Sequence, residues 1–152
     1  MVCLGNICRS PMAEGILRQK ILLHRLPWEV DSAGTGGWHV GETPDERAIK
    51  TMRKMGVDIS GFIARQFQVS DFSRFDHIYV MDSSNYLEVI RQASGDQEIN
   101  KVDLIMNELY EGRNMAVPDP YYGGMTDFMN VYDMLNKACD RIVEKYKHGN
   151  IR

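Results

Sequence analysis

Short apolar runs alternate with helix-like segments along this chain, and that alternation limits the possible folds more than any other feature. Residues 76–82 form an apolar run that suits a buried strand, and residues 83–93 behind it have helical spacing that ends before Gly95. Residues 101–106 are a further strand candidate. Strands that alternate with helices favour parallel βαβ units. We therefore expect an α/β fold whose ligands bind beyond the carboxyl ends of the strands.

A helix start signal stands close to the beginning of the chain. Ser10 suits the N-cap and Pro11 the first helical position, and apolar residues follow at helical spacing until Pro27. Residues 28–32 alternate like a short strand, and the glycine-rich residues 33–37 are typical of a loop. Residues 3–10 are therefore predicted to be the first strand-to-helix turn.

Two more helices are predicted further along the chain. Thr43 and Glu46 have the spacing of a capping box, which would open a helix that Gly56 closes. From residue 126 apolar side chains recur at helical spacing as far as Gly149. Between these segments, residues 112–124 form a stretch rich in glycine and proline that is long enough to be a functional loop.

Composition excludes several classes of protein. The 152 residues, 43% hydrophobic and 26% charged, predict one folded domain over residues 1–152. No apolar run approaches the roughly 18 residues of a membrane helix and no signal peptide is evident, so we expect a cytoplasmic protein with no membrane partner. A net charge of -3 without a basic block predicts no nucleic-acid partner. Three scattered cysteines and four histidines predict neither a disulfide framework nor a metal site.

The turn over residues 3–10 combines the groups that phosphate chemistry needs. A loop curled around an anion offers successive backbone N–H groups, and the helix behind it adds more donors and a dipole. Arg9 has a planar fork that can hold two phosphate oxygens. The same donors favour the thiolate of Cys3, which would attack phosphorus and form a phosphocysteine. Alone, each residue is commonly structural; together with Gly5 and the strand-turn-helix context they favour a catalytic site.

Two further residues have chemistry of interest. Cys8 is either a packed thiol or a partner that traps oxidised Cys3 as a disulfide. Asp119 lies between two prolines and is the candidate proton donor for a leaving group, with an ordinary turn aspartate as the alternative. Pro120 favours an extended conformation at Asp119, which should aim its side chain away from the local backbone.

Three aromatic residues, Trp38, Tyr121 and Tyr122, are candidates for the walls of a deep cleft, although aromatic side chains are more often part of a core. Such a cleft would select phosphotyrosine, because phosphoserine is too short to reach Cys3.

With these residues in place, the chain resembles the low-molecular-weight protein tyrosine phosphatases over nearly all its length. The matching segments are Cys3-Leu4-Gly5-Asn6-Ile7-Cys8-Arg9-Ser10-Pro11, Asp31-Ser32-Ala33-Gly34-Thr35, Ala64-Arg65-Gln66, Met81-Asp82-Ser83-Ser84-Asn85 and Asp119-Pro120-Tyr121-Tyr122. The resemblance implies a three-layer αβα, flavodoxin-like phosphotyrosine phosphatase I fold with a four-stranded parallel sheet in the order 2-1-3-4. It also implies no cofactor, a phosphotyrosine protein as substrate, inorganic phosphate or another oxyanion in the pocket, and a monomer.

The resemblance also assigns roles to residues. Cys3 would be the nucleophile, Arg9 the phosphate clamp, and Asp119 first the acid and then the base for water. Ser32 would support the loop in a hydrogen-bond network with Asn6 and Ser10, and Trp38 would stand at the pocket rim. The phosphate-binding residues that it implies are Leu4, Gly5, Asn6, Ile7, Cys8 and Ser10.

The chain departs from the family pattern at two places. Only Met1 and Val2 precede Cys3, where the family has a full apolar strand, so either the true start lies upstream or the central strand is short. Phe62 stands where relatives often carry a histidine that steadies the loop asparagine.

Three alternative functions use the same first loop. Arsenate reduction needs additional cysteines, and none lies between Cys8 and Cys139. In phosphoarginine phosphatases a smaller polar residue stands in place of Ile7, and the tyrosine pair is missing. A module that binds phosphate without turnover gains nothing from the nearby Asp119, because a carboxylate repels an anion.

Overall fold

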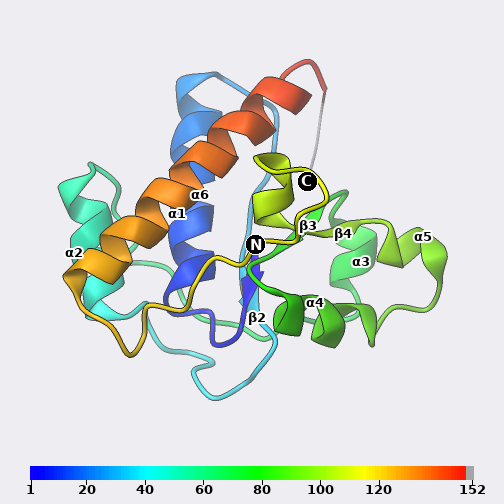
Figure 1. The fold of residues 1–152 in the computed structure, drawn as a ribbon, viewed down its shortest axis with the longest axis horizontal. Coiled ribbons are helices and arrows are strands. Elements are labelled where there is room, and N and C mark those ends of the chain that lie inside the picture. The colour runs from blue at the N-terminus through cyan, green and yellow to red at the C-terminus, as the bar shows by residue number, and fades with distance from the viewer. Residues whose placement is uncertain (150–152) are drawn as a thin grey trace.

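A four-stranded parallel sheet with helices on both faces forms the centre of the molecule (Figure 1). The structure is a computed structural model that describes residues 1–149. The strands follow the order β2-β1-β3-β4, so the predicted α/β fold with the order 2-1-3-4 is confirmed. The strands are β1 (Val2–Cys3), β2 (Ala33–Gly34), β3 (Ile78–Val80) and β4 (Val102–Leu104).

Helices connect the strands and cover the sheet. The described residues form the α-helices α1 (Arg9–Leu23), α2 (Glu46–Lys54), α3 (Asp71–Arg74), α4 (Ser83–Ile90), α5 (Asp96–Ile99) and α6 (Met125–Tyr146), and the 3-10 helix η1 (Ile105–Glu108). Figure 1 shows α1 and α6 side by side on one side of the sheet, with α3 and α4 on the other. Among the described residues, no helix combines the length and apolarity needed to cross a membrane.

The alternation of side chains along the strands divides the core in two. Val2 and Val80 point into a cluster that includes Phe72 of α3. Cys3 and Tyr79, the neighbouring residues on the same strands, join the cluster formed by α1 and α6. This is the side-chain period of two that a strand imposes, and it buries both faces of the sheet as a parallel sheet requires.

The first helix differs from the prediction at both ends. It begins at Arg9 with Cys8 as N-cap, and Ser10 does not cap it. The hydroxyl of Ser10 is instead engaged by side chains of the loop in front of the helix. The helix ends at Leu23, before Pro27, because Arg25 adopts a left-handed conformation with φ 52°.

The second helix begins where Asp45, rather than Thr43, caps it. The carboxylate of Asp45 accepts a hydrogen bond of 2.8 Å from the backbone N–H of Arg47, so the predicted capping box is wrong. Gly56 follows the helix with φ 80°, as predicted.

The second strand lies later in the chain than predicted. Residues 28–32 form no strand, and Ala33–Gly34, predicted as loop, are β2. The position of β2 follows from its pairing with β1. Val2 pairs with Ala33 and Cys3 with Gly34, so the two residues of β1 decide where β2 forms. The short helices α3, α5 and η1 were not predicted, α4 ends at Ile90, and α6 ends at Tyr146.

Candidate active site

In the loop between β1 and α1, carbonyl groups accept hydrogen bonds from neighbouring segments, while among the described residues the backbone N–H groups stay unpaired. Backbone N–H groups of Gly36 and Asp45 donate to the carbonyls of Leu4 and Ile7, both at 2.8 Å. Within the described part of the chain, no backbone N–H of residues 4–8 donates a hydrogen bond. Unpaired N–H groups next to a helix N-terminus form an anion site.

Gly34 of β2 allows this close packing behind the loop. A Cβ at Gly34 would stand 2.8 Å from the carbonyl oxygen of Leu4 and 3.0 Å from the backbone nitrogen of Asn6. Backbone atoms cannot move aside cheaply, so only glycine fits at this position of the second strand.

Cys3 lies at the end of β1, buried, with its sulfur 3.0 Å from the Oγ of Ser10. Asn6 donates its side-chain amide to Ser10 at 2.7 Å and to the Oγ of Ser32 at 2.9 Å. The side-chain oxygen of Asn6 accepts from the backbone N–H of Arg65 at 3.0 Å. The structure thus brings together the three residues that the resemblance placed in one network beside Cys3.

Arg9 lines the same cavity as Cys3, and only 3% of its side chain is exposed. It donates to Asp82 at 2.7 Å and to the carbonyl of Val117 at 3.0 Å. The other oxygen of Asp82 caps α4 by accepting from the N–H of Asn85. Sequence reasoning missed Asp82 as the partner of Arg9, although a carboxylate directly behind a predicted strand was an available signal.

Asp119 stands across the cleft, with a carboxylate oxygen 3.6 Å from Arg9 and 41% of its side chain exposed. Its other oxygen accepts a hydrogen bond of 3.1 Å from the backbone N–H of Tyr121. The expectation that its side chain points away from the local backbone is therefore wrong. A short aspartate side chain readily bonds the N–H two residues ahead in a turn, and here this bond fixes the carboxylate beside the cleft.

One open cavity of about 230 Å³ joins these groups. Its floor and walls consist of Cys3, Leu4, Gly5, Ile7, Cys8, Arg9, Trp38, His39, Asp119, Tyr121 and Tyr122. The three aromatic residues expected at a cleft thus line it, and the tyrosine rings meet edge to face at 5.0 Å. The cavity lies at the carboxyl end of β1, where a parallel sheet places its ligands.

Two residues of this region carried no recognisable signal in the sequence. His39 lines the cavity beside Trp38, and its ring bonds Glu42 at 2.5 Å. Arg47 of α2 donates to the carbonyls of Tyr121 and Gly123, both at 2.9 Å, and so holds the loop that bears Asp119.

Cys8 lines the same cavity, but its thiol is not suited to act as a nucleophile near pH 7. Burial, followed by the nearby carboxylate of Asp45, raises the pKa of the Cys8 thiol far above its ordinary value. The thiol is therefore neutral near pH 7. Cys3, Cys8 and Cys139 are all free.

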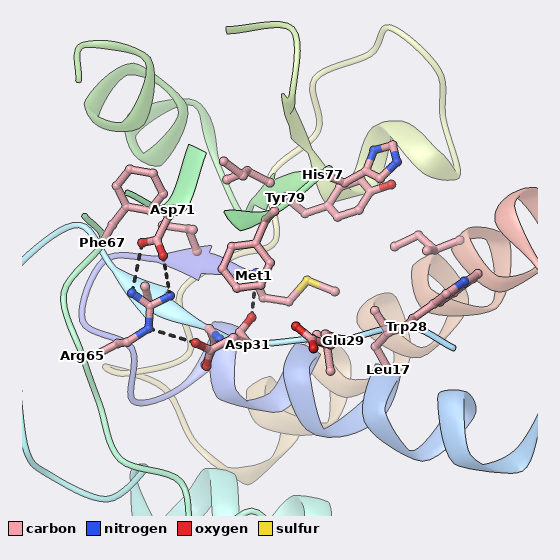
Figure 2. Close-up of a pocket in the computed structure, with 17 residues that line it drawn as sticks. Met1, Leu17, Trp28, Glu29, Asp31, Arg65, Phe67, Asp71, His77 and Tyr79 are labelled. Atoms are coloured by element: carbon pink, nitrogen blue, oxygen red, sulfur yellow. Dashed lines mark hydrogen bonds and ion pairs between the residues drawn. The ribbon is translucent and has the colours of Figure 1, made fainter. Parts of the chain in front are cut away.

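A second cavity opens at the opposite end of the sheet, around Met1 (Figure 2). Arg65 crosses its edge between Asp31 and Asp71, and apolar side chains such as Trp28 and Phe67 line much of the rest. This cavity lies at the amino ends of the strands, and no cysteine is among the described residues that line it. The first cavity is therefore the candidate active site.

No cluster of side chains suited to a metal ion is present among residues 1–149. The groups that face the candidate active site are a thiol, a guanidinium, a carboxylate and free backbone N–H groups. Such a set can bind a phosphoryl group, attack it and protonate its leaving group.

Comparison with known proteins identifies what the chain is similar to. The family model of low molecular weight phosphotyrosine protein phosphatases matches residues 1–150. The low molecular weight phosphotyrosine protein phosphatase of Schizosaccharomyces pombe is 42% identical, over 88% of this chain and 86% of the relative. A protein tyrosine phosphatase from Entamoeba histolytica, solved with Hepes in its active site, is 38% identical with a TM-score of 0.90, over 97% of this chain and 94% of that one. Drosophila arginine phosphatase is 34% identical with a TM-score of 0.89, over 96% and 95%.

Proposed function

The chain belongs to the low molecular weight phosphotyrosine protein phosphatase family, and from that premise we propose how its own residues hydrolyse phosphotyrosine. As a protein tyrosine phosphatase it is a phosphoric monoester hydrolase. The observation that carries the proposal is the cleft in which Cys3, Arg9 and Asp119 meet beside unpaired backbone N–H groups.

Binding of the phosphoryl group uses the loop as a cradle. The free N–H groups of residues 4–8 and the start of α1 attract the phosphoryl oxygens. Arg9 offers its fork while Asp82 and the Val117 carbonyl hold its orientation. A guanidinium fixed in this way stabilises the extra charge of the transition state with little reorganisation.

The first chemical step transfers the phosphoryl group to sulfur. The Cys3 thiolate attacks phosphorus, an S–P bond forms, and the bond from phosphorus to the phenolic oxygen breaks. The hydroxyl of Ser10, next to the sulfur, stabilises the thiolate before attack. Asp119, entering in its protonated form, delivers its proton to the departing oxygen.

The second step releases phosphate. Asp119, now a carboxylate, removes a proton from a water molecule that attacks the phosphorus of the cysteinyl phosphate. The S–P bond breaks, inorganic phosphate leaves, and the thiolate of Cys3 is regenerated.

The walls of the cleft favour an aromatic substrate. Trp38, Tyr121 and Tyr122 all line the cavity that contains Cys3, and their rings are suited to stack against a phenyl ring. Ile7 gives the lining of the cavity an apolar side chain, which favours phosphotyrosine over phosphoarginine. Relative rates on phosphotyrosine, phosphoserine and phosphoarginine peptides measure this selectivity, and comparable rates on the first two contradict the deep cleft.

The protein works on this account as a monomer in the cytoplasm. Three free cysteines support a reducing compartment, because oxidation would inactivate a thiolate nucleophile. The cleft is lined by residues of one chain, so the proposed mechanism needs no second copy.

The nucleophile is tested by Cys3→Ser. The variant should lose turnover of p-nitrophenyl phosphate, because a serine hydroxyl is not ionised near pH 7, and should still bind vanadate or inorganic phosphate in the cradle. Mass spectrometry of acid-quenched wild-type enzyme should locate phosphate on Cys3 during turnover. Retained hydrolysis by Cys3→Ser, or phosphate trapped on another residue, would remove the assignment.

A further inference from the structure

A buried acid lies behind the phosphate loop, and the hydrolysis described above makes no use of it. Glu14 belongs to α1, one turn after Ser10, and only 7% of its side chain is exposed. A buried carboxylate is costly unless it is paired and hydrogen-bonded. The partners of Glu14 therefore indicate its role.

Both oxygens of Glu14 are engaged. One accepts a hydrogen bond of 2.6 Å from the guanidinium of Arg18, and the other accepts one of 2.6 Å from the hydroxyl of Ser32. The guanidinium of Arg18 is itself held, because it lies 5.5 Å above the ring of Phe62 and donates to the carbonyl of Val30 at 3.2 Å.

The bonds of Ser32 continue to the nucleophile in one direction. A hydroxyl has one hydrogen, and since Ser32 gives it to Glu14, the oxygen of Ser32 accepts from Asn6 at 2.9 Å. The other amide hydrogen of Asn6 goes to Ser10 at 2.7 Å. The hydrogen of Ser10 then has the sulfur of Cys3 at 3.0 Å as its nearest acceptor, ahead of the Ala33 carbonyl at 3.4 Å.

The direction of this chain depends on the acid at its far end. A carboxylate paired with a guanidinium has only acceptors, so Ser32 must donate toward Glu14. If Glu14 carried a hydrogen or an amide on that side, Ser32 would turn, and Asn6 would lose a fixed partner. The hydroxyl of Ser10 would then no longer be directed to donate its hydrogen to the sulfur of Cys3.

Resting on the phosphatase function set out above, we propose that Glu14 and Arg18 are positioning residues for the nucleophile. They set the direction of the hydrogen bonds that run through Ser32, Asn6 and Ser10 to Cys3, and so direct a donor at the thiolate. Phe62 supports the same chain by holding the guanidinium of Arg18 in place.

The sharpest test is Glu14→Gln, which keeps the size of the side chain but offers one acceptor where Arg18 and Ser32 need two. We expect kcat/KM for p-nitrophenyl phosphate to fall roughly tenfold. The rate of Cys3 alkylation by iodoacetamide at pH 7 should fall in parallel, because thiolate is the reactive form. Burial raises the pKa of Cys139 to about 12 and that of Cys8 still further, so the reaction reports on Cys3.

Asp140→Asn is the matched control. Asp140 of α6 pairs with Lys20 of α1 at 2.6 Å, so this change also converts a carboxylate paired with α1 into an amide, away from the loop. It should leave both rates within about twofold of wild type. Equal losses in Asp140→Asn and Glu14→Gln would overturn the proposal, as would wild-type alkylation of Cys3 in Glu14→Gln.

A second pair of variants keeps the test open should Glu14→Gln fold poorly. Arg18→Lys retains the charge and Arg18→Gln does not, at a side chain that is 51% exposed. Arg18→Lys should recover most of the Cys3 alkylation rate that Arg18→Gln loses, and identical rates in the two variants contradict the proposal. None of these outcomes bears on the nucleophile itself, which Cys3→Ser tests separately.

Discussion

Asn6 adopts a left-handed backbone conformation, with φ 57°, that few residues other than glycine tolerate. Asparagine is among the exceptions, and here its side chain makes three hydrogen bonds, to Ser10, Ser32 and the backbone of Arg65. These bonds hold the turn at the point where the loop reverses. The side chain of Asn6 thus shapes the loop without lining the cavity, whereas Asp119 lines the cavity, held by a turn bond to the N–H of Tyr121 and by its ion pair with Arg9 at 3.6 Å.

Asp119→Asn tests the proposed role of Asp119 as proton donor. The variant keeps an oxygen that can accept from the N–H of Tyr121, so the loop should stay in place while the proton is lost. For phenyl phosphate, a poor leaving group, kcat should fall between about a hundredfold and ten-thousandfold, and the loss for p-nitrophenyl phosphate should be smaller.

Asp127→Asn is the control for this change. Asp127 accepts from the N–H of Gly124 at the end of the same loop but does not line the cavity. Steady-state rates over a series of aryl phosphates check both variants. An equal loss for good and poor leaving groups in Asp119→Asn would argue against an acid at this position.

At the scale of elements, the site depends on how loops are fastened to the sheet. The backbone N–H of Val117 donates to the carbonyl of Met81 at 2.8 Å, directly behind β3. From α2, Arg47 donates to the carbonyls of Tyr121 and Gly123 and is itself held by Asp45 at 2.9 Å. The Asp119 loop is therefore clamped from two sides, by a strand end and by a helix.

Arg47→Met tests the clamp from α2. Methionine keeps an apolar stem against Phe128, over whose ring the guanidinium of Arg47 lies at 4.7 Å, but it has no donors for the loop. We expect kcat for phenyl phosphate to fall roughly tenfold, because a small misplacement of the acid is costly. Inhibition by inorganic phosphate should change little, since the cradle is untouched.

Arg53→Met on the same helix provides the comparison. Among residues 1–149, the guanidinium of Arg53 forms one ion pair, with Asp58 at 3.9 Å on the surface, so its loss should leave the same rate unchanged. Equal kcat values in Arg47→Met and wild type would show that the loop holds its shape without α2.

At the scale of the whole molecule, a cavity lies at each end of the sheet. The carboxyl ends of the strands hold the candidate active site, and the amino ends surround a second cavity, lined by apolar side chains and by charged ones such as Arg65 and Asp71 (Figure 2). His77 lies at this second end, with its ring 4.6 Å from that of Tyr146 on α6. Burial lowers the pKa of His77 below its ordinary value of 6.5, although Asp76 and Glu108 oppose the change.

The lowered pKa of His77 predicts a pH dependence of stability. Well above pH 6.5 the ring is neutral in both the folded and the unfolded chain, so it adds nothing to the pH dependence of stability. As the pH falls below 6.5 the unfolded chain takes up the proton first, so the free energy of unfolding decreases until the folded pKa is passed.

Urea titrations of His77→Phe at pH 7.5 and 5.5 measure this effect. The variant keeps an aromatic ring against Tyr146, and its urea midpoint should fall less on acidification than that of wild type. His24→Phe, at an exposed position after α1, should show the wild-type fall. A wild-type fall in His77→Phe would locate the acid sensitivity elsewhere.

Local signals in the sequence were sufficient for much of this protein. Apolar runs and helical spacing determined the α/β class, and the residues between Cys3 and Pro11 determined a strand-to-helix turn suited to phosphate. These properties depend on neighbours within one or two turns of chain. The strand order came from the family resemblance, because many orders are compatible with the same runs.

Only the tertiary structure decided which distant groups meet. Arg9 bonds Asp82 and Val117, which lie 73 and 108 residues away, and no periodicity encodes such pairs. The same holds for Arg47 behind the Asp119 loop. Even a local prediction failed where other contacts competed. Ser10 was predicted to cap α1, but its hydroxyl bonds Cys3 and Asn6 of the loop. A side chain makes the contacts that give the folded chain the lower free energy, and distant partners come within reach only when the chain folds.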